Sequence, residues 1–111
     1  MEFMNKFEAV ILLSPEITSS ARKNLCDEFT KLITDSSGQI LNTEDWGLRD
    51  LSYKIGNFNK AFYNFFQIEI DSNNIESIKK SLNQKENFIR YIFIKVLNHQ
   101  ELPTKLNYEK K

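Results

Sequence analysis

The stretch that decides the fold is NTEDWGLRDLSYKI, which spans Asn42 to Ile55 of this 111-residue chain. It contains the only tryptophan, Trp46, and one of the three glycines, Gly47. Apolar and polar residues alternate toward its end, as in a half-buried strand, and a glycine inside a strand is typical of a bulge or bend. The stretch contains no nucleophile–base pair and no cluster of metal ligands. It therefore predicts a bent strand that belongs to a binding surface.

Before this stretch, the sequence predicts a strand followed by a helix. Lys6–Leu13 is almost entirely apolar, which is typical of a central strand with both faces covered. A helix capped by Ser14 or Thr18 is expected to run to about Thr34, because its apolar residues recur on one helical face. We expect Gly38 to close this helix in the left-handed conformation that favours glycine.

After this stretch, the sequence predicts two more strands and a second helix. Gly56–Asn59 is expected to form a hairpin loop, and Ala61–Asp71 the third strand. Ser72–Asn74 is expected to cap a helix whose apolar residues again share one face. Glu86–Leu97 is the fourth predicted strand, and the polar residues 98–111 are expected to form a flexible tail.

The order β-α-β-β-α-β is that of a ferredoxin-like sandwich, which is an α+β fold. Right-handed crossovers place both helices on one face of a four-stranded antiparallel sheet and leave the other face open. A chain of this length forms one domain. The prediction is therefore a single ferredoxin-like domain over residues 1–97, followed by the tail.

Aromatic residues are more numerous than a core of this size needs, with nine Phe and four Tyr in the chain. If Phe66 faces the helices, the alternation of a strand turns its neighbours toward the open face. Three interpretations stay open for the aromatic rings: core filling, stacking of RNA bases, and docking of an apolar segment of a protein partner. The candidate partner-binding residues are Trp46, Tyr63, Phe65 and Tyr91.

The charges balance overall but not along the chain, with 15 basic and 15 acidic side chains in total. Residues 1–55 carry 6 basic and 9 acidic side chains, a net charge of −3, and residues 56–111 carry 9 and 6, a net charge of +3. Because phosphate contacts supply most non-specific affinity for nucleic acids, a neutral chain is expected to share any such role with a partner. Arg49 and Arg90 stand inside apolar strand patterns, where an arginine usually meets an anion or a carboxylate.

The residues that could support catalysis are few and isolated. The only histidine, His99, begins the polar tail without an orienting carboxylate nearby in sequence, and we expect it to be solvated. The only cysteine, Cys26, is expected to fill space at the core edge. Neither a Gly-rich phosphate loop nor a Cys/His zinc spacing occurs, so no enzyme, cofactor, metal or small-molecule substrate is predicted. A lone cysteine, no signal-peptide pattern and no apolar run of about 20 residues predict a cytoplasmic protein without a membrane partner.

The stretch from Trp46 to Ile55 closely resembles the signature of the bacterial small-subunit ribosomal protein S6 family. Matches at Phe7-Glu8, Leu13-Ser14-Pro15, Phe62-Tyr63 and Phe88-Ile89-Arg90 extend the resemblance over about residues 5–96. The resemblance implies a structural, non-catalytic protein of the ribosome. It also implies binding to the central domain of the small-subunit ribosomal RNA together with ribosomal protein S18, as a heterodimer that helps to assemble the platform.

The resemblance also carries over individual basic residues. Arg49 and Arg90 match arginines of the family, and Lys54 and Lys95 match common basic sites near the RNA or the partner. Lys85 stands two residues after a position where the family often has arginine. The predicted RNA-binding residues are therefore Lys6, Arg49, Lys54, Lys85, Arg90 and Lys95.

Two alternative functions come from other classes of protein. A stand-alone RNA-recognition module would bind single-stranded RNA by stacking bases on Tyr63, Phe65 and Tyr91, but the third strand lacks the Gly/aromatic run of that module. An acylphosphatase-like enzyme on the same fold would need a phosphate-cradling loop, which this sequence lacks. Similarity of fold alone does not support that activity.

Overall fold

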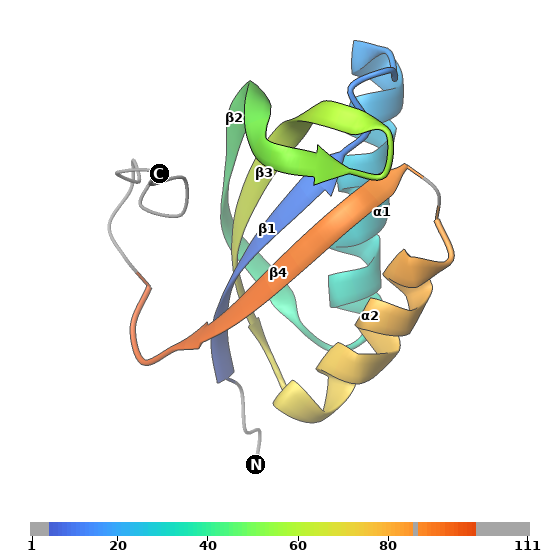
Figure 1. Ribbon diagram of the computed structural model, residues 1–111. Helices are drawn as coiled ribbons and strands as arrows, with labels where there is room; N and C mark the ends of the chain where they lie inside the picture. Colours follow the sequence, from blue (N-terminus) through green and yellow to red (C-terminus); the bar gives the residue numbers. More distant parts are fainter. Residues whose placement is uncertain (1–4, 86, 100–111) are drawn as a thin grey trace.

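The computed structural model describes residues 5–85 and 87–99, and its elements follow the predicted order (Figure 1). The strands are β1 (Asn5–Leu13), β2 (Gln39–Ile55), β3 (Phe58–Ile70) and β4 (Phe88–Val96). The helices are α1 (Ser19–Asp35) and α2 (Ile75–Asn83), and a short 3-10 helix, η1 (Ser72–Asn74), precedes α2. The predicted ferredoxin-like α+β fold is confirmed. Most of the predicted tail lies outside the described residues.

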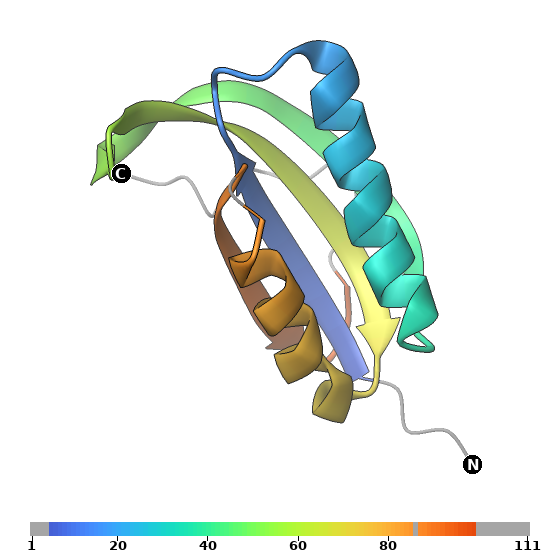
Figure 2. The same ribbon diagram turned by 90° about the vertical axis from the view of Figure 1, so that its right-hand side faces the viewer.

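The four strands form one antiparallel sheet in the order β2-β3-β1-β4, so β1 is central while β2 and β4 are the edges. β1 pairs with β3 over its whole length and with β4 from Lys6 to Leu13. Both helices cover the same face of the sheet (Figure 2). We call the opposite surface the helix-free face.

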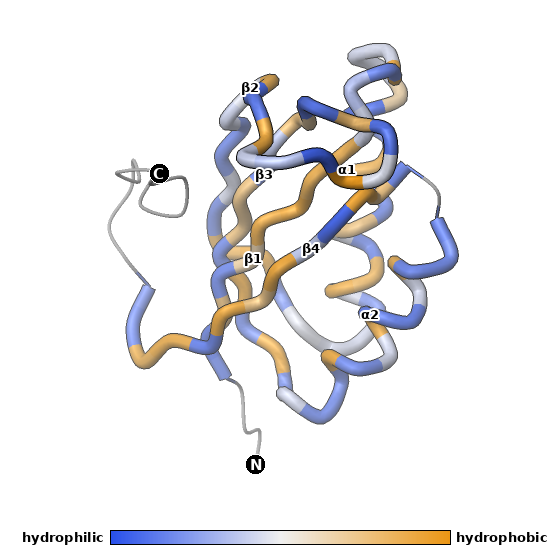
Figure 3. The backbone as a smooth tube through the Cα atoms, viewed as in Figure 1, coloured by the Kyte–Doolittle hydropathy of each residue, from blue (hydrophilic) through white to orange (hydrophobic). Residues whose placement is uncertain are grey.

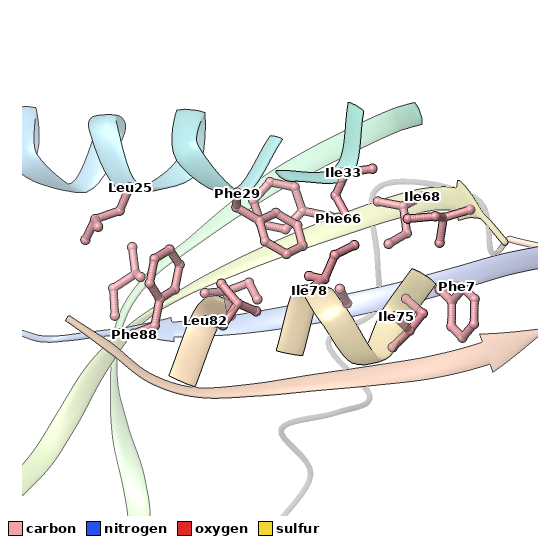
Figure 4. Close-up of a cluster of buried hydrophobic side chains, with 14 residues drawn as sticks. Phe7, Leu25, Phe29, Ile33, Phe66, Ile68, Ile75, Ile78, Leu82 and Phe88 are labelled. Carbon is pink, nitrogen blue, oxygen red and sulfur yellow. The ribbon is translucent and has the colours of Figure 1, made fainter. Parts of the chain in front are cut away.

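The main core lies between the sheet and the two helices (Figure 4). Phe29 of α1 is fully buried, and its ring centroid lies 4.6 Å from that of Phe66 on β3. Ile78 and Leu82 of α2 are buried in the same cluster. β1 is apolar along most of its length (Figure 3), as expected for a strand with both faces covered.

A second, smaller cluster of apolar side chains lies on the helix-free face. Its buried members are Val10, Leu12, Trp46, Ala61 and Phe65. Leu51 and Ile55 pack against these residues from the end of β2. They can do so because the β2–β3 hairpin continues past the last β1–β3 pair, Leu13↔Phe62, and its tip curls round (Figure 1). We call these seven residues the hairpin cluster, and it lies toward the hairpin end of the helix-free face.

The ends of α1 differ in part from the prediction. Thr18, one of the two predicted caps, accepts a hydrogen bond from a backbone N–H of the first turn at 3.1 Å. The prediction that Gly38 adopts the left-handed conformation is wrong, because Ser37 adopts it, with φ 67°. Glycine is instead required at position 38 because β3 lies too close for a side chain. A Cβ there would lie 2.9 Å from the backbone carbonyl oxygen of Glu69 on β3.

Two further boundaries differ from the prediction. The hairpin turn is shorter than expected, because β3 already begins at Phe58 and only Gly56, with φ 59°, and Asn57 lie between the strands. The second helix is entered differently as well. Asp71 accepts a hydrogen bond from the backbone N–H of Asn73 at 2.9 Å and so starts η1, whereas the side chain of Asn74 makes no capping hydrogen bond.

Candidate functional site

The stretch around Trp46 forms a bulge that is fixed by its own hydrogen bonds. Gly47 has φ 79°, and the β2–β3 register shifts between Asp45 and Gly47, which confirms the predicted bend. The Asp45 carboxylate accepts from the Gly47 backbone N–H at 2.8 Å, and Trp46 Nε1 donates to Glu44 Oε1 at 2.9 Å. Arg49 Nε donates to the Trp46 carbonyl at 2.9 Å. The bulge therefore turns the Trp46 ring onto the helix-free face and holds it there.

Three of the four predicted partner-binding rings meet on this face. The Trp46 ring stacks on Phe65 at a centroid distance of 5.2 Å and an interplanar angle of 11°, and lies 6.4 Å from the ring of Tyr63. Phe65 is 0% and Trp46 8% exposed, so both belong to the hairpin cluster rather than to the surface. The accessible aromatic side chain nearby is Tyr53, which is 70% exposed. A partner on this half of the face would meet Tyr53 and the rim of the cluster.

The fourth predicted ring, Tyr91, lies on the other face of the sheet. It pairs in register with Ile11, packs against the main core and meets Phe93 edge-on at 5.9 Å. Its hydroxyl donates to Asn83 Oδ1 at the end of α2, at 2.9 Å. The parity of β4 could not be read from the sequence, because both of its faces carry apolar residues.

The six predicted RNA-binding residues fall into two groups at opposite ends of the sheet. Arg49, Lys54, Lys85 and Arg90 lie toward the hairpin end, whereas Lys6 and Lys95 lie at the other end of β1 and β4. A single RNA backbone would therefore have to pass along the molecule to reach all six.

Some of these basic residues already interact with other groups of the chain. Lys6 Nζ lies 3.9 Å from Glu69, and Lys85 Nζ lies 3.2 Å from Glu28 of α1. Arg49 is half-buried and engaged with the bulge.

Three of the predicted cations remain accessible. Lys54, Arg90 and Lys95 are exposed, and they form no ion pair with any residue in the described ranges 5–85 and 87–99. Lys54 lies near the tip of the hairpin, and Arg90 is opposite Leu12 near the start of β4. Lys95 is opposite Phe7 on the helix-covered side. These three are the cations best placed to meet phosphate groups.

A chain of polar side chains lies on the helix-free face beyond the hairpin cluster. Glu8, only 2% exposed, accepts from Gln67 Nε2 at 3.1 Å, and Gln67 Oε1 accepts from Asn42 Nδ2 at 3.1 Å. The expectation of a solvated His99 is wrong. Its side chain is 12% exposed, with Nδ1 3.6 Å from Glu8 Oε2. In the sequence, Glu8 stands out only as part of the Phe7-Glu8 family match, although an acidic residue in a largely apolar central strand was a signal that its carboxylate would be buried.

Cys26 lies at the edge of the main core, as predicted. Burial raises the pKa of its thiol to about 11, and the carboxylates of Asp45 and Asp27 act in the same direction, opposed by Arg22. A thiol with this pKa is protonated at neutral pH and is a poor nucleophile. The thiol lines a cleft of about 310 Å³ between α1 and the edge strand β2.

Neither a metal site nor a membrane span is found in the part of the chain that the structure describes. No three His, Cys, Asp or Glu side chains there come together as metal ligands would. No helix within those residues has both the length and the apolar character needed to cross a bilayer.

Comparison with known proteins gives a consistent result. The family model described as "Ribosomal protein S6" matches residues 6–95. The small ribosomal subunit protein bS6 of Rickettsia prowazekii (strain Madrid E) is 39% identical over 92 residues, which are 83% of this chain and 76% of that protein. The bS6 protein of Orientia tsutsugamushi (strain Ikeda) is 33% identical over 93 residues, which are 84% and 79% of the two chains.

A solved structure gives the same fold. The crystal structure of the 30S ribosomal protein S6 from Thermotoga maritima superposes with a TM-score of 0.80, at 22% identity, and covers 85% of this chain and 89% of that one. At this identity, the likeness supports the ferredoxin-like fold described above.

Proposed function

Since the chain belongs to the ribosomal protein S6 family, we propose that it is a structural constituent of the small ribosomal subunit. We propose further that it binds the central domain of the small-subunit ribosomal RNA jointly with ribosomal protein S18, and so acts in the cytoplasm on the ribosome. The single observation that carries this proposal is the family match over residues 6–95, which spans nearly the whole described domain.

The distribution of charge supports joint rather than independent RNA binding. Of the six predicted RNA-binding residues, three are exposed and form no ion pair with a described residue, and these three, Lys54, Arg90 and Lys95, lie at different ends of the sheet. Non-specific affinity for nucleic acid grows with the number of phosphates that are neutralised, so three scattered cations provide little of it. A partner that supplies further cations and orients the chain would make up the difference.

The helix-free face supports a protein partner. It is rich in apolar side chains, and its hairpin cluster buries Phe65 completely. A stand-alone module that stacks bases on Tyr63, Phe65 and Tyr91 would need all three rings at one open surface. Phe65 is buried and Tyr91 lies on the helix-covered face, so the three rings do not form the shared open surface that this alternative requires.

Two measurements test the proposal. A tagged copy of the chain should co-migrate with the small subunit on a sucrose gradient. Purified protein should bind a central-domain ribosomal RNA fragment weakly alone and at least tenfold more tightly once S18 is added. Sedimentation only at the top of the gradient would refute the ribosomal role. Equal RNA affinity with and without S18 would refute joint binding.

A further inference from the structure

An amide without a hydrogen-bond partner lies at the floor of the cleft between α1 and the sheet. Asn64 of β3 is opposite Asp45 of β2 and shares the helix-covered side with Phe66, two residues further along the strand. Asn64 is 8% exposed, and its Oδ1 has no hydrogen-bond partner among the described residues. Asn64 lines the cleft of about 310 Å³ together with Cys26 of α1, which runs along this side of the sheet (Figure 2). A buried polar group without a partner is destabilising, and the cleft is where a ligand can supply one.

The amide of Asn64 can offer its oxygen to the cleft without a change of the backbone. The oxygen is now the covered end of the amide. The torsion that exchanges oxygen and nitrogen, χ2, is soft, and the two ends of an amide have nearly the same size. A half-turn about χ2 therefore brings the oxygen to the open end of the side chain, where a hydrogen-bond donor in the cleft can reach it.

The charged side chains that line the cleft carry more acidic than basic groups. They are Arg22, Lys23, Asp27, Glu44 and Asp45, with a net charge of −1. Arg22 lies over the ring of Phe62, 4.0 Å from its centroid, and Lys23 Nζ lies 3.7 Å from Asp27. Glu44 accepts from the Trp46 indole. Asp45 is exposed beside Asn64 and accepts from the Gly47 N–H, but a carboxylate has about four acceptor positions and keeps capacity for a further donor.

The thiol of Cys26 responds to the same charges. Burial is the first cause that raises its pKa to about 11, and the carboxylates of Asp45 and Asp27 each raise the pKa by more than Arg22 lowers it. These three charges together therefore produce a negative potential inside the cleft. A phosphate placed there would be repelled, whereas an ammonium group would be attracted.

We propose that this cleft binds a primary ammonium group, which donates to Asn64 Oδ1 at the floor and to the Asp45 carboxylate at the rim. The cleft volume is at the lower end for small-molecule sites, so the ligand is small or is a single side chain. A free aliphatic amine and a lysine side chain of a peptide both provide this chemistry. None of the residues predicted to meet RNA or S18 lines the cleft, so the site goes beyond the proposed function.

The first experiment titrates 1,4-diaminobutane into the full-length protein and follows the side-chain amide signals of Asn64 and the backbone amide signal of Cys26 by NMR. We expect saturable shifts of both. 1,4-Butanediol has the same chain length with hydroxyl in place of ammonium groups, and it should bind at least tenfold more weakly, because hydrogen bonds from charged donors are stronger. Succinate should leave the signals in place. Equal binding of the three compounds, or binding of none, would overturn the proposal.

Variants of the two acceptors test their roles. Asn64→Val removes the amide and should weaken the binding of 1,4-diaminobutane at least tenfold. Asp45→Asn keeps an acceptor for the Gly47 N–H but removes the charge, and it should weaken binding about twofold to fivefold. Asp50→Asn, which removes the same charge from the same strand outside the cleft, is the matched control and should bind like the wild type. Wild-type affinity in both Asn64→Val and Asp45→Asn would overturn the site.

Thermal melts distinguish a binding role of Asn64 from a purely structural one. Without ligand, Asn64→Val removes a buried acceptor that has no partner, so the melting temperature should rise by about 4 to 8 °C. Added 1,4-diaminobutane should raise the melting temperature of the wild type and not that of Asn64→Val. A lower melting temperature of the free variant would mean that the amide serves the fold, and it would overturn the proposal.

A competition experiment separates the two sources of the ammonium group. The peptide acetyl-Gly-Lys-Gly-amide is titrated in the same way and compared with 1,4-diaminobutane. Tighter binding of the diamine assigns the site to a free amine, and tighter binding of the peptide assigns it to a lysine side chain; both results support the site. Because neither RNA nor S18 is present, failure here leaves the ribosomal proposal intact, and a chain that fails to join the small subunit can still bind the amine.

Discussion

The contrast between accessible and paired cations leads to a quantitative prediction about salt. Lys54 and Arg90 lie toward the same end of the sheet, and neither forms an ion pair with a described residue. Lys6 and Lys85 already pair with Glu69 and Glu28. The double variant Lys54→Ala/Arg90→Ala should therefore lose two phosphate contacts, whereas Lys6→Ala/Lys85→Ala removes cations that are largely neutralised.

The magnitude follows from counterion release. Each phosphate contact contributes about 0.7 to 0.9 to the slope of log affinity against log salt, so losing two contacts should flatten the slope by about 1.4 to 1.8. Over a fourfold rise in salt, the affinity of the Lys54→Ala/Arg90→Ala variant should then fall about sevenfold to twelvefold less than that of the wild type.

The assay is fluorescence anisotropy of a labelled central-domain RNA fragment, titrated with the protein–S18 complex at several salt concentrations. The Lys6→Ala/Lys85→Ala complex serves as the matched control, since it loses the same formal charge. An equal change of slope for the two double variants would refute the argument that ion pairing separates these residues. A larger change for the control would show that the paired lysines release their carboxylates on the RNA.

Three further predictions concern the fold. Gly38→Ala should lower the free energy of unfolding by about 1 to 3 kcal/mol, because the new Cβ would lie 2.9 Å from the backbone carbonyl oxygen of Glu69 on β3. Ser37→Gly should raise the free energy of unfolding by about 0.5 to 1 kcal/mol, because glycine adopts φ 67° without strain. Urea unfolding of the two variants measures both changes. Phe65→Ala should lower the free energy of unfolding by about 3 to 5 kcal/mol, because the ring is fully buried. A loss below about 0.5 kcal/mol would contradict the description of the hairpin cluster as a second core. The unfolded Cys26 thiol loses its proton near pH 9.0 and the folded one at about 11, so stability should fall as pH rises through that window. In thermal melts at alkaline pH, the melting temperature of Cys26→Ala should fall less steeply with rising pH than that of the wild type.

The fold was predictable because its signals are local and repeated. The apolar run of β1, the single-faced helices and the element order require no knowledge of distant contacts. The bend at Gly47 was also predictable, because a glycine inside a strand has few other uses. Gly38 shows the limit of this approach. Its identity is set by a carbonyl of β3, about thirty residues away in sequence, and local rules assign it to the helix end instead.

The candidate site was harder to predict because burial and pairing are tertiary properties. The sequence grouped four aromatic residues as one surface, but the curl of the hairpin buries Phe65 and the register of β4 sends Tyr91 to the other face. It also treated six cations alike, although Glu69 and Glu28 neutralise two of them. His99 was the largest error. Its carboxylate partner, Glu8, lies at the far end of the sequence and next to it only in space.

The central position of β1 has a consequence for the order in which the molecule is made. Its two neighbours in the sheet are β3 and β4, and β4 is the last element of the described chain to leave the ribosome during synthesis. Until then, one edge of a nearly all-apolar strand has no hydrogen-bonding neighbour and can pair with other chains. The sheet can close only after translation of Phe88–Val96, so the β4 edge of β1 stays unpaired while the rest of the chain is synthesised.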